Sequence, residues 1–143
     1  MTDTSNALKP VLTFLQQYAP FCQMLPAHQE YLAMHLEQVF YAENDDIVLP
    51  QDGVTDSLYI IKNGCVSGES EQETVTVTPR KFAGPVEKLE PGHCFPIDAL
   101  VNKRAVNYQH RAIQSTICYR LTQSHFEYLM QQSIIFHDFI LKQ

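Results

Sequence analysis

The sequence predicts a mainly β fold, an antiparallel jelly-roll β-barrel with N-terminal helices and a C-terminal helix. Apolar residues recur at helical spacing near both ends of the chain, before about residue 38 and after residue 124. The middle of the chain carries β-branched and aromatic runs that turn residues separate. The length of 143 residues is usual for one domain, so a single domain over residues 1–143 is expected.

The N-terminal helices are expected over residues 5–38. Leu8 and Val11 begin a helical apolar stripe, and Pro20 ends this segment because proline cannot continue a helix. Pro26 suits the first position of a second helix. These two segments form the part of the domain that precedes the strands.

The β-roll is expected over residues 38–121. Asn-Gly within Lys62–Cys65 lies between two apolar runs and favours a tight hairpin. Residues 73–78, ETVTVT, alternate as a half-buried strand does. Residues 86–95 and 110–121 supply further strands.

A C-terminal helix is expected over residues 124–142. Ser124 and Glu127 have the spacing of a capping box, which predicts the start of this helix. At 100° per residue, one apolar face gathers the side chains expected to cover the barrel. These are Phe126, Leu129, Met130, Phe136 and Ile140.

The opposite face of this helix carries Tyr128, Ile135 and Phe139. Burying one large apolar side chain stabilises by about 1.5–3 kcal/mol, so a second stripe favours association. We expect these three residues to form an interface, either of a two-fold homodimer or with a following domain. The alternative is that an N-terminal helix of the same chain covers them.

Composition and spacing argue against several classes of function. No apolar run reaches the ~20 residues of a membrane span, and no secretory signal is present, so a cytoplasmic protein is expected. The net charge of −6 argues against direct binding to nucleic acid. The histidines and cysteines form no metal-ligand pattern, and no nucleophile–base signature occurs. We therefore expect no metal site, no catalytic residues and no enzymatic activity.

Three stretches resemble cyclic-nucleotide-binding domains of the catabolite-activator type. The first, GVTDSLYIIKNGCVSG at residues 53–68, is similar to the central strands of that family. The second, LEPGHCFPIDALVNKRAVNYQHRA at residues 89–112, stands where the family keeps its phosphate-binding cassette. The third, STICYRLTQSHFEYLM at residues 115–130, resembles the closing strand and C-terminal helix. The resemblance extends from Ala19 to Leu141 and implies the jelly-roll fold.

A narrower resemblance concerns the context of the domain. The forms CFP-x-x-AL, CYRL and F-x-D-F are similar to the N-terminal module of certain bacterial signalling proteins. In those proteins a CBS-domain pair and a nucleotidyltransferase-like region follow this module. The resemblance implies that the chain is part of a longer regulator with these domains as partners.

The cassette keeps the frame of the family and departs from its chemistry. In the family, a Phe-Gly-Glu sequence precedes a short helix, the Glu accepts from a ribose hydroxyl, and a later Arg pairs with the phosphate. Phe95 matches the Phe, but Pro96 replaces the Gly and has no N–H. Ile97 replaces the Glu, and Val106 holds the position of the Arg.

The remaining cassette residues bear on which ligand could bind. Asp98 adds negative charge where a phosphate would lie, whereas Arg104 supplies a cation two residues before the family position. The resemblance implies a ligand-binding set of Phe95, Pro96, Ile97, Asp98, Ala99, Leu100, Arg104 and Arg111.

The sequence thus predicts a regulatory ligand-sensing module of a bacterial signal-transduction protein with a degenerate phosphate cassette. A small-molecule effector is the expected partner, and no cofactor is expected; a cyclic nucleotide or another small anion stays open as ligand. One alternative is a genuine cAMP or cGMP sensor that uses Arg104 and backbone amides. Another is the effector domain of a catabolite-activator-type transcription factor, which would need a helix-turn-helix beyond Gln143.

Overall fold

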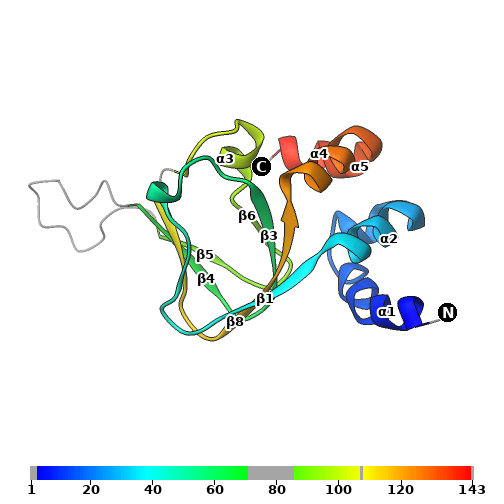
Figure 1. Ribbon diagram of the computed structural model, residues 1–143, viewed down its shortest axis with the longest axis horizontal. Coiled ribbons are helices and arrows are strands. Elements are labelled where there is room, and N and C mark those ends of the chain that lie inside the picture. Colours follow the sequence, from blue (N-terminus) through cyan, green and yellow to red (C-terminus); the bar gives the residue numbers. More distant parts are fainter. Residues whose placement is uncertain (1–2, 71–85, 107, 143) are drawn as a thin grey trace, which may run out of the picture.

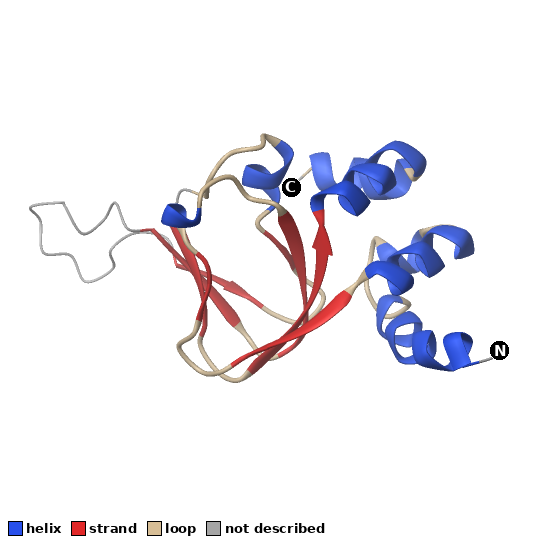
Figure 2. Ribbon diagram, in the orientation of Figure 1, coloured by secondary structure: helices blue, strands red, loops and turns tan. Residues whose placement is uncertain are grey.

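A computed structural model describes residues 3–70, 86–106 and 108–142 of the chain. Its strands form two antiparallel sheets of four strands each, drawn in red in Figure 2. One sheet has the order β1-β8-β3-β6 and the other β2-β7-β4-β5. The strands are Glu37–Tyr41 (β1), Asp46–Val48 (β2), Ser57–Asn63 (β3), Val66–Ser70 (β4), Val86–Leu89 (β5), Cys94–Phe95 (β6), Tyr108–Ala112 (β7) and Thr116–Thr122 (β8). This arrangement confirms the predicted jelly roll with flanking helices.

The longer helices gather at one end of the sheets. They are Asp3–Leu15 (α1), Pro26–His35 (α2), Gln123–Gln132 (α4) and Ile134–Leu141 (α5), while the short helix Ile97–Val101 (α3) follows β6. Short 3-10 turns lie at Phe21–Gln23 and Pro50–Asp52. Figure 1 shows α1, α2, α4 and α5 on one side of the sheets, with α3 near the C-terminal end of the chain. No helix among the described residues is long and apolar enough to cross a membrane.

The central strands β3 and β8 are buried on both faces. In β3, Leu58 and Ile60 pack toward the helices, whereas Ile61 packs into the space between the sheets. In β8, Leu121 faces the helices and Cys118 faces the interior. Successive side chains of a strand point to opposite faces, so a strand that is covered on both sides reads as a continuous apolar run. The run LYII in β3 therefore reflects two cores, one on each face.

The Asn63-Gly64 turn joins the two sheets and forms no hairpin. The preceding strand, β3, pairs with β8 and β6, while β4 pairs with β5 and β7 in the other sheet. Gly64 has φ of +100°, and a Cβ there would lie 2.4 Å from Oγ1 of Thr116. Only glycine fits such a close approach at positive φ. The predicted turn is thus present, but the prediction of a hairpin was wrong. The predicted strand at residues 73–78 lies outside the described residues.

The C-terminal segment consists of two helices, where the sequence predicted one over 124–142. The break falls at Ser133, whose extended backbone (φ −114°, ψ 109°) ends α4 and begins α5. The Ser133 hydroxyl accepts a hydrogen bond from the backbone N–H of Phe136 at 3.1 Å, as an N-cap does. The predicted capping box is absent, because α4 begins at Gln123 and its N-cap residue is Thr122.

An aromatic cluster joins α2 to α4. The hydroxyl of Tyr31 on α2 lies 2.8 Å from Nδ1 of His125 on α4. The rings of His35 and His125 stack with centroids 3.9 Å apart, and those of Tyr31 and Tyr128 stack at 4.3 Å. Burial lowers the pKa of His35 below its ordinary value, and the charge of the neighbouring His125 lowers it further. The two ends of the chain are therefore held together by specific ring contacts.

Candidate functional site

A cavity of about 720 Å³ lies beside α3. Its wall comes from Ala19, the end of β5, most of the residues between Gly92 and Val106, His110 on β7 and the last residues of α5. The volume falls in the range of ~300–1,000 Å³ that is usual for small-molecule sites. The cavity is therefore large enough for a metabolite of nucleotide size.

Most of the residues predicted from the cassette meet at this cavity. Phe95, at the end of β6, and Ala99, on α3, are 2% and 4% exposed and line its wall. Pro96 is the N-cap residue of α3, and Ile97 is the first residue of this helix. Leu100 does not line the cavity, because its side chain packs into the core under the helices.

The helix α3 offers little to an anion. Its N-cap Pro96 makes no side-chain capping bond, and proline has no N–H to donate. Ile97 brings an apolar side chain to the cavity, where a hydrogen-bonding side chain would be needed for a ribose. Val106, which replaces the expected arginine, is 6% exposed and packs with the residues between the sheets.

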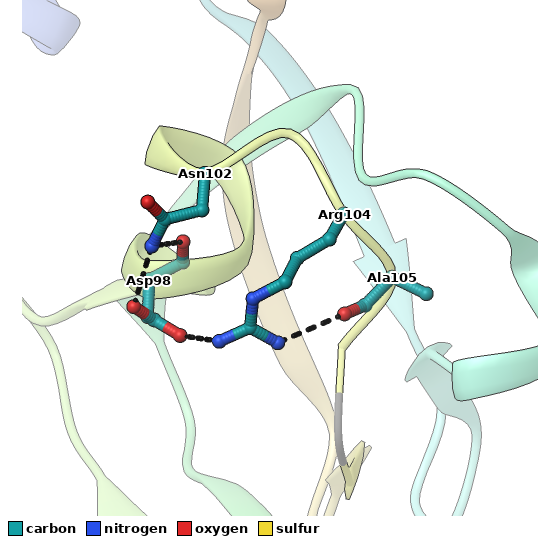
Figure 3. Close-up of polar contacts among 4 residues, drawn as sticks. All are labelled: Asp98, Asn102, Arg104 and Ala105. Atoms are coloured by element: carbon teal, nitrogen blue, oxygen red, sulfur yellow. Dashed lines mark hydrogen bonds and ion pairs between the residues drawn. The ribbon is translucent and has the colours of Figure 1, made fainter.

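Arg104 lies at the cavity with its charge already compensated. Its guanidinium forms an ion pair with the carboxylate of Asp98, as Figure 3 shows. The side-chain amide of Asn102 donates to the same carboxylate at 2.8 Å and to the Asp98 backbone oxygen at 3.0 Å. Asp98 and Arg104 thus both lie at the cavity, as the sequence predicted. They form an ion pair with each other.

Arg111 is the other predicted residue that does not line the cavity. It lies on β7 directly opposite Asp46 of β2, and its Nε donates to the Asp46 carboxylate at 3.1 Å. Its position in the ladder makes this a cross-strand ion pair. Arg111 therefore joins β2 and β7 and is not part of the cavity wall.

His110 is a cavity residue that the sequence did not predict. Its side chain is 3% exposed, and its ring stacks on Phe95 with centroids 4.9 Å apart. Burial lowers the pKa of His110 to about 4, so the imidazole is neutral at pH 7. The alternation of side chains along β7 could have predicted that His110 is buried, because His110 lies two residues before buried Ala112 and shares its face.

The turn before β6 fixes the entrance to the cassette. The backbone N–H of Glu90 donates to Nδ1 of His93 at 2.7 Å, and the N–H of Gly92 donates to the Ile61 oxygen at 2.8 Å. Gly92 has φ of +93°, and a Cβ there would lie 2.3 Å from the ring of Tyr18. A glycine is required at this point, and it lets the N-terminal segment pack closely against the cassette.

The three predicted interface residues have different surroundings. Tyr128 is 43% exposed, while Ile135 and Phe139 are partly buried against the core under the helices. Phe139 also lines the cavity. Because Tyr128 is exposed while Ile135 and Phe139 are partly covered, the three side chains do not form one continuous exposed stripe. The interface itself stays a prediction.

The described residues contain no group of three or more His, Cys, Asp or Glu side chains that could hold a metal ion. The four cysteines are free thiols; Cys118 is buried and Cys22 is exposed. The candidate site combines apolar lining residues with the neutral imidazole of His110, the ion pair of Asp98 and Arg104, and Lys88.

No family model and no curated protein matches the sequence. Solved structures with the same fold do match. The sensor domain of the transcriptional regulator DNR from Pseudomonas aeruginosa has a TM-score of 0.71 at 13% identity, over 92% of this chain and 88% of that one.

Two further matches are regulatory parts of protein kinase A. The regulatory domain from Toxoplasma gondii, solved with cAMP, has a TM-score of 0.77 at 19% identity over 96% of this chain. The regulatory subunit of a cAMP-independent protein kinase A from Trypanosoma brucei has a TM-score of 0.77 at 16% identity over 100%. The chain spans about half the length of these two, 49% and 48%. The chain therefore has the jelly-roll fold of cyclic-nucleotide-binding sensor and regulatory domains.

Proposed function

We propose that this chain is a regulatory, non-catalytic ligand-sensing module of a bacterial signal-transduction protein. Its phosphate cassette is degenerate, and its effector is a small molecule other than a cyclic nucleotide, or the module works without one. The observation that carries this proposal is the ion pair between Asp98 and Arg104 at a cavity of about 720 Å³. Arg104, the cation that the cassette brings to the cavity, already has a carboxylate partner.

The other cassette positions support the same reading. Pro96 removes a donor, Ile97 removes an acceptor, and the buried Val106 removes a second cation from the place expected for it. A hydrogen bond to a charged group contributes about 1.5–3 kcal/mol, so losing several of them is decisive for affinity. The fold itself is compatible with either outcome, because the matching structures include one with cAMP and one described as cAMP-independent.

Two alternatives have specific observations in their favour. Arg104 lines the cavity, which favours a genuine cAMP or cGMP sensor in which the nucleotide displaces Asp98. The match to a sensor domain of a transcriptional regulator favours an effector domain of a transcription factor. Binding isotherms with both cyclic nucleotides separate the first alternative from our proposal. A helix-turn-helix beyond residue 143 would support the second.

The context of the module is part of the proposal. We place it in the cytoplasm, before a CBS-domain pair and a nucleotidyltransferase-like region in a longer protein, on the strength of the sequence resemblance. Self-association through the last two helices is also proposed. The apolar side chains exposed there are Tyr128 (43%), Ile134 (69%) and Leu141 (54%). A symmetric contact between such helices is the simplest closed assembly.

A thermal-shift screen of anionic metabolites tests the role of the cavity. If one of them is the effector, it should raise the melting temperature of the parent, and Arg104→Ala should abolish that shift. Arg111→Ala is the matched control, because it removes an ion-paired arginine that does not line the cavity. A stabilising anion that acts equally on the parent and on Arg104→Ala would contradict the assignment of Arg104.

A further inference from the structure

The charges that line the cavity are unevenly distributed. Among the described lining residues, Lys88 and Arg104 are the cationic side chains, and Asp98 is the only carboxylate. Removing the Asp98 charge would leave two cations at one cavity, which is the electrostatic composition of an anion site. A single carboxylate therefore decides the charge balance of this wall.

The contacts around Asp98 hold its carboxylate on Arg104. Asn102, the C-cap residue of α3, donates to the carboxylate through its side-chain amide at 2.8 Å. Two hydrogen bonds hold the backbone of Arg104: its N–H donates to the Ala99 oxygen at 3.0 Å, and its carbonyl accepts from the N–H of Thr55 at 3.1 Å. Both partners of the ion pair are thus fixed by further groups, as Figure 3 shows in part.

We propose that Asp98 is a specificity-determining residue that occupies Arg104 as an internal anion and excludes phosphate ligands from the cavity. This inference rests on the proposed function in one respect, namely that the cavity is the ligand site. A phosphate that approaches Arg104 must displace the carboxylate or lie beside it, and like charges disfavour the second arrangement. Ligands without a negative charge meet no such barrier.

The size of the effect follows from where the pair lies. The side chains of Arg104 and Asp98 are 39% and 69% exposed, so water and salt screen their interaction. We therefore expect that removing the carboxylate strengthens phosphate binding by about three- to tenfold at low ionic strength. The gain should shrink as salt is added.

The test compares four proteins with inorganic phosphate and with cAMP as probes, at constant ionic strength. Asp98→Asn keeps the size of the side chain and removes its charge. Asp98→Asn with Arg104→Gln tests whether a gain passes through Arg104. Asp46→Asn is the matched control, because it removes the carboxylate from Arg111 outside the cavity. Binding is followed by NMR shifts of the arginine Nε–H groups and by calorimetry, and circular dichroism checks the fold.

The inference predicts a gain in Asp98→Asn, none in Asp46→Asn, and loss of the gain in the double variant. It is overturned if Asp98→Asn binds no tighter than the parent, if Asp46→Asn gains as much, or if the double variant keeps the gain. Asp98→Ser replaces Asp98→Asn should the latter not fold. A micromolar affinity of the parent for cAMP would refute the proposed function, whereas the ratio between variant and parent alone decides the role of Asp98.

Discussion

His110 gives the interior of the cavity a neutral polar group. The ring is 3% exposed and stacks on Phe95, and burial lowers its pKa to about 4. A neutral imidazole can both donate and accept a hydrogen bond. The buried imidazole is therefore an uncharged polar group in the cavity wall, while the charged groups Asp98 and Arg104 are partly exposed.

The buried His110 makes stability depend on pH. Its pKa is about 4 in the folded protein and near the ordinary 6.5 when unfolded, so the unfolded chain binds more protons between these values. Stability is then unaffected above about pH 6.5 and falls as pH is lowered toward 4, by about 3 kcal/mol. His110→Phe should reduce the loss of unfolding free energy between pH 7.5 and pH 4.5 by about 2–3 kcal/mol.

Urea unfolding of the parent and of His110→Phe at both pH values measures this difference. His35, whose pKa is also lowered, titrates in both proteins and cancels in the comparison. An equal loss of stability in the two proteins would show that His110 is not held neutral by the fold.

The residues of the site were predictable in part. The positions of Phe95, Ile97 and Val106 at one cavity followed from the order of the cassette in the sequence. The ion pair of Asp98 with Arg104 did not, because it depends on how the chain turns between α3 and β7. Sequence spacing places two charges in one loop but does not say whether they face each other or a ligand.

Among the elements, the break between α4 and α5 depends on one serine. The Ser133 hydroxyl is buried and accepts from the N–H of Phe136 at 3.1 Å. Ser133→Ala should lower the unfolding free energy by about 1 kcal/mol, because the first turn of α5 loses its cap. Ser124→Ala is the control with an expected effect near zero, since Ser124 is exposed and is not the N-cap of α4.

Chemical denaturation of both variants tests this pair. A larger loss in Ser124→Ala than in Ser133→Ala would mean that the helix begins where the sequence spacing suggested. The sequence misled here because Ser124 and Glu127 have capping-box spacing, yet Glu127 instead bonds to Gln123 at 3.0 Å and to Lys103 at 3.2 Å. The predicted core face is nevertheless present: Phe126, Leu129, Phe136 and Ile140 are buried, and Met130 is partly buried against them.

For the whole molecule, the fold was the most predictable level. Apolar runs in the strands and helical stripes at both ends show which side chains must be buried. Because burial of apolar surface is the main force that drives folding, these patterns predict the fold. The partition of strands between two sheets was less predictable. The Asn63-Gly64 turn has hairpin composition, but β3 pairs with β8 and β6 in one sheet, whereas β4 pairs with β5 and β7 in the other. Those partners are distant in the sequence, so the local turn composition could not predict them.

The net charge of −6 affects how the whole molecule interacts with anionic ligands. A protein with a net negative charge repels anions. Salt limits this repulsion to distances of about 8–10 Å from the charged groups. Anion binding would need a strong local site to overcome this repulsion. In the described cassette, Asp98 instead compensates Arg104.

The central claim is that the fold is kept while the cyclic-phosphate chemistry is lost, and calorimetric titration of the chain with cAMP and cGMP tests it most directly. We predict no saturation by either nucleotide below about 1 mM, which corresponds to only ~4 kcal/mol of binding free energy. The same titration of Asp98→Asn shows whether the missing affinity is due to that carboxylate. A micromolar dissociation constant of the parent chain for either nucleotide would contradict the account.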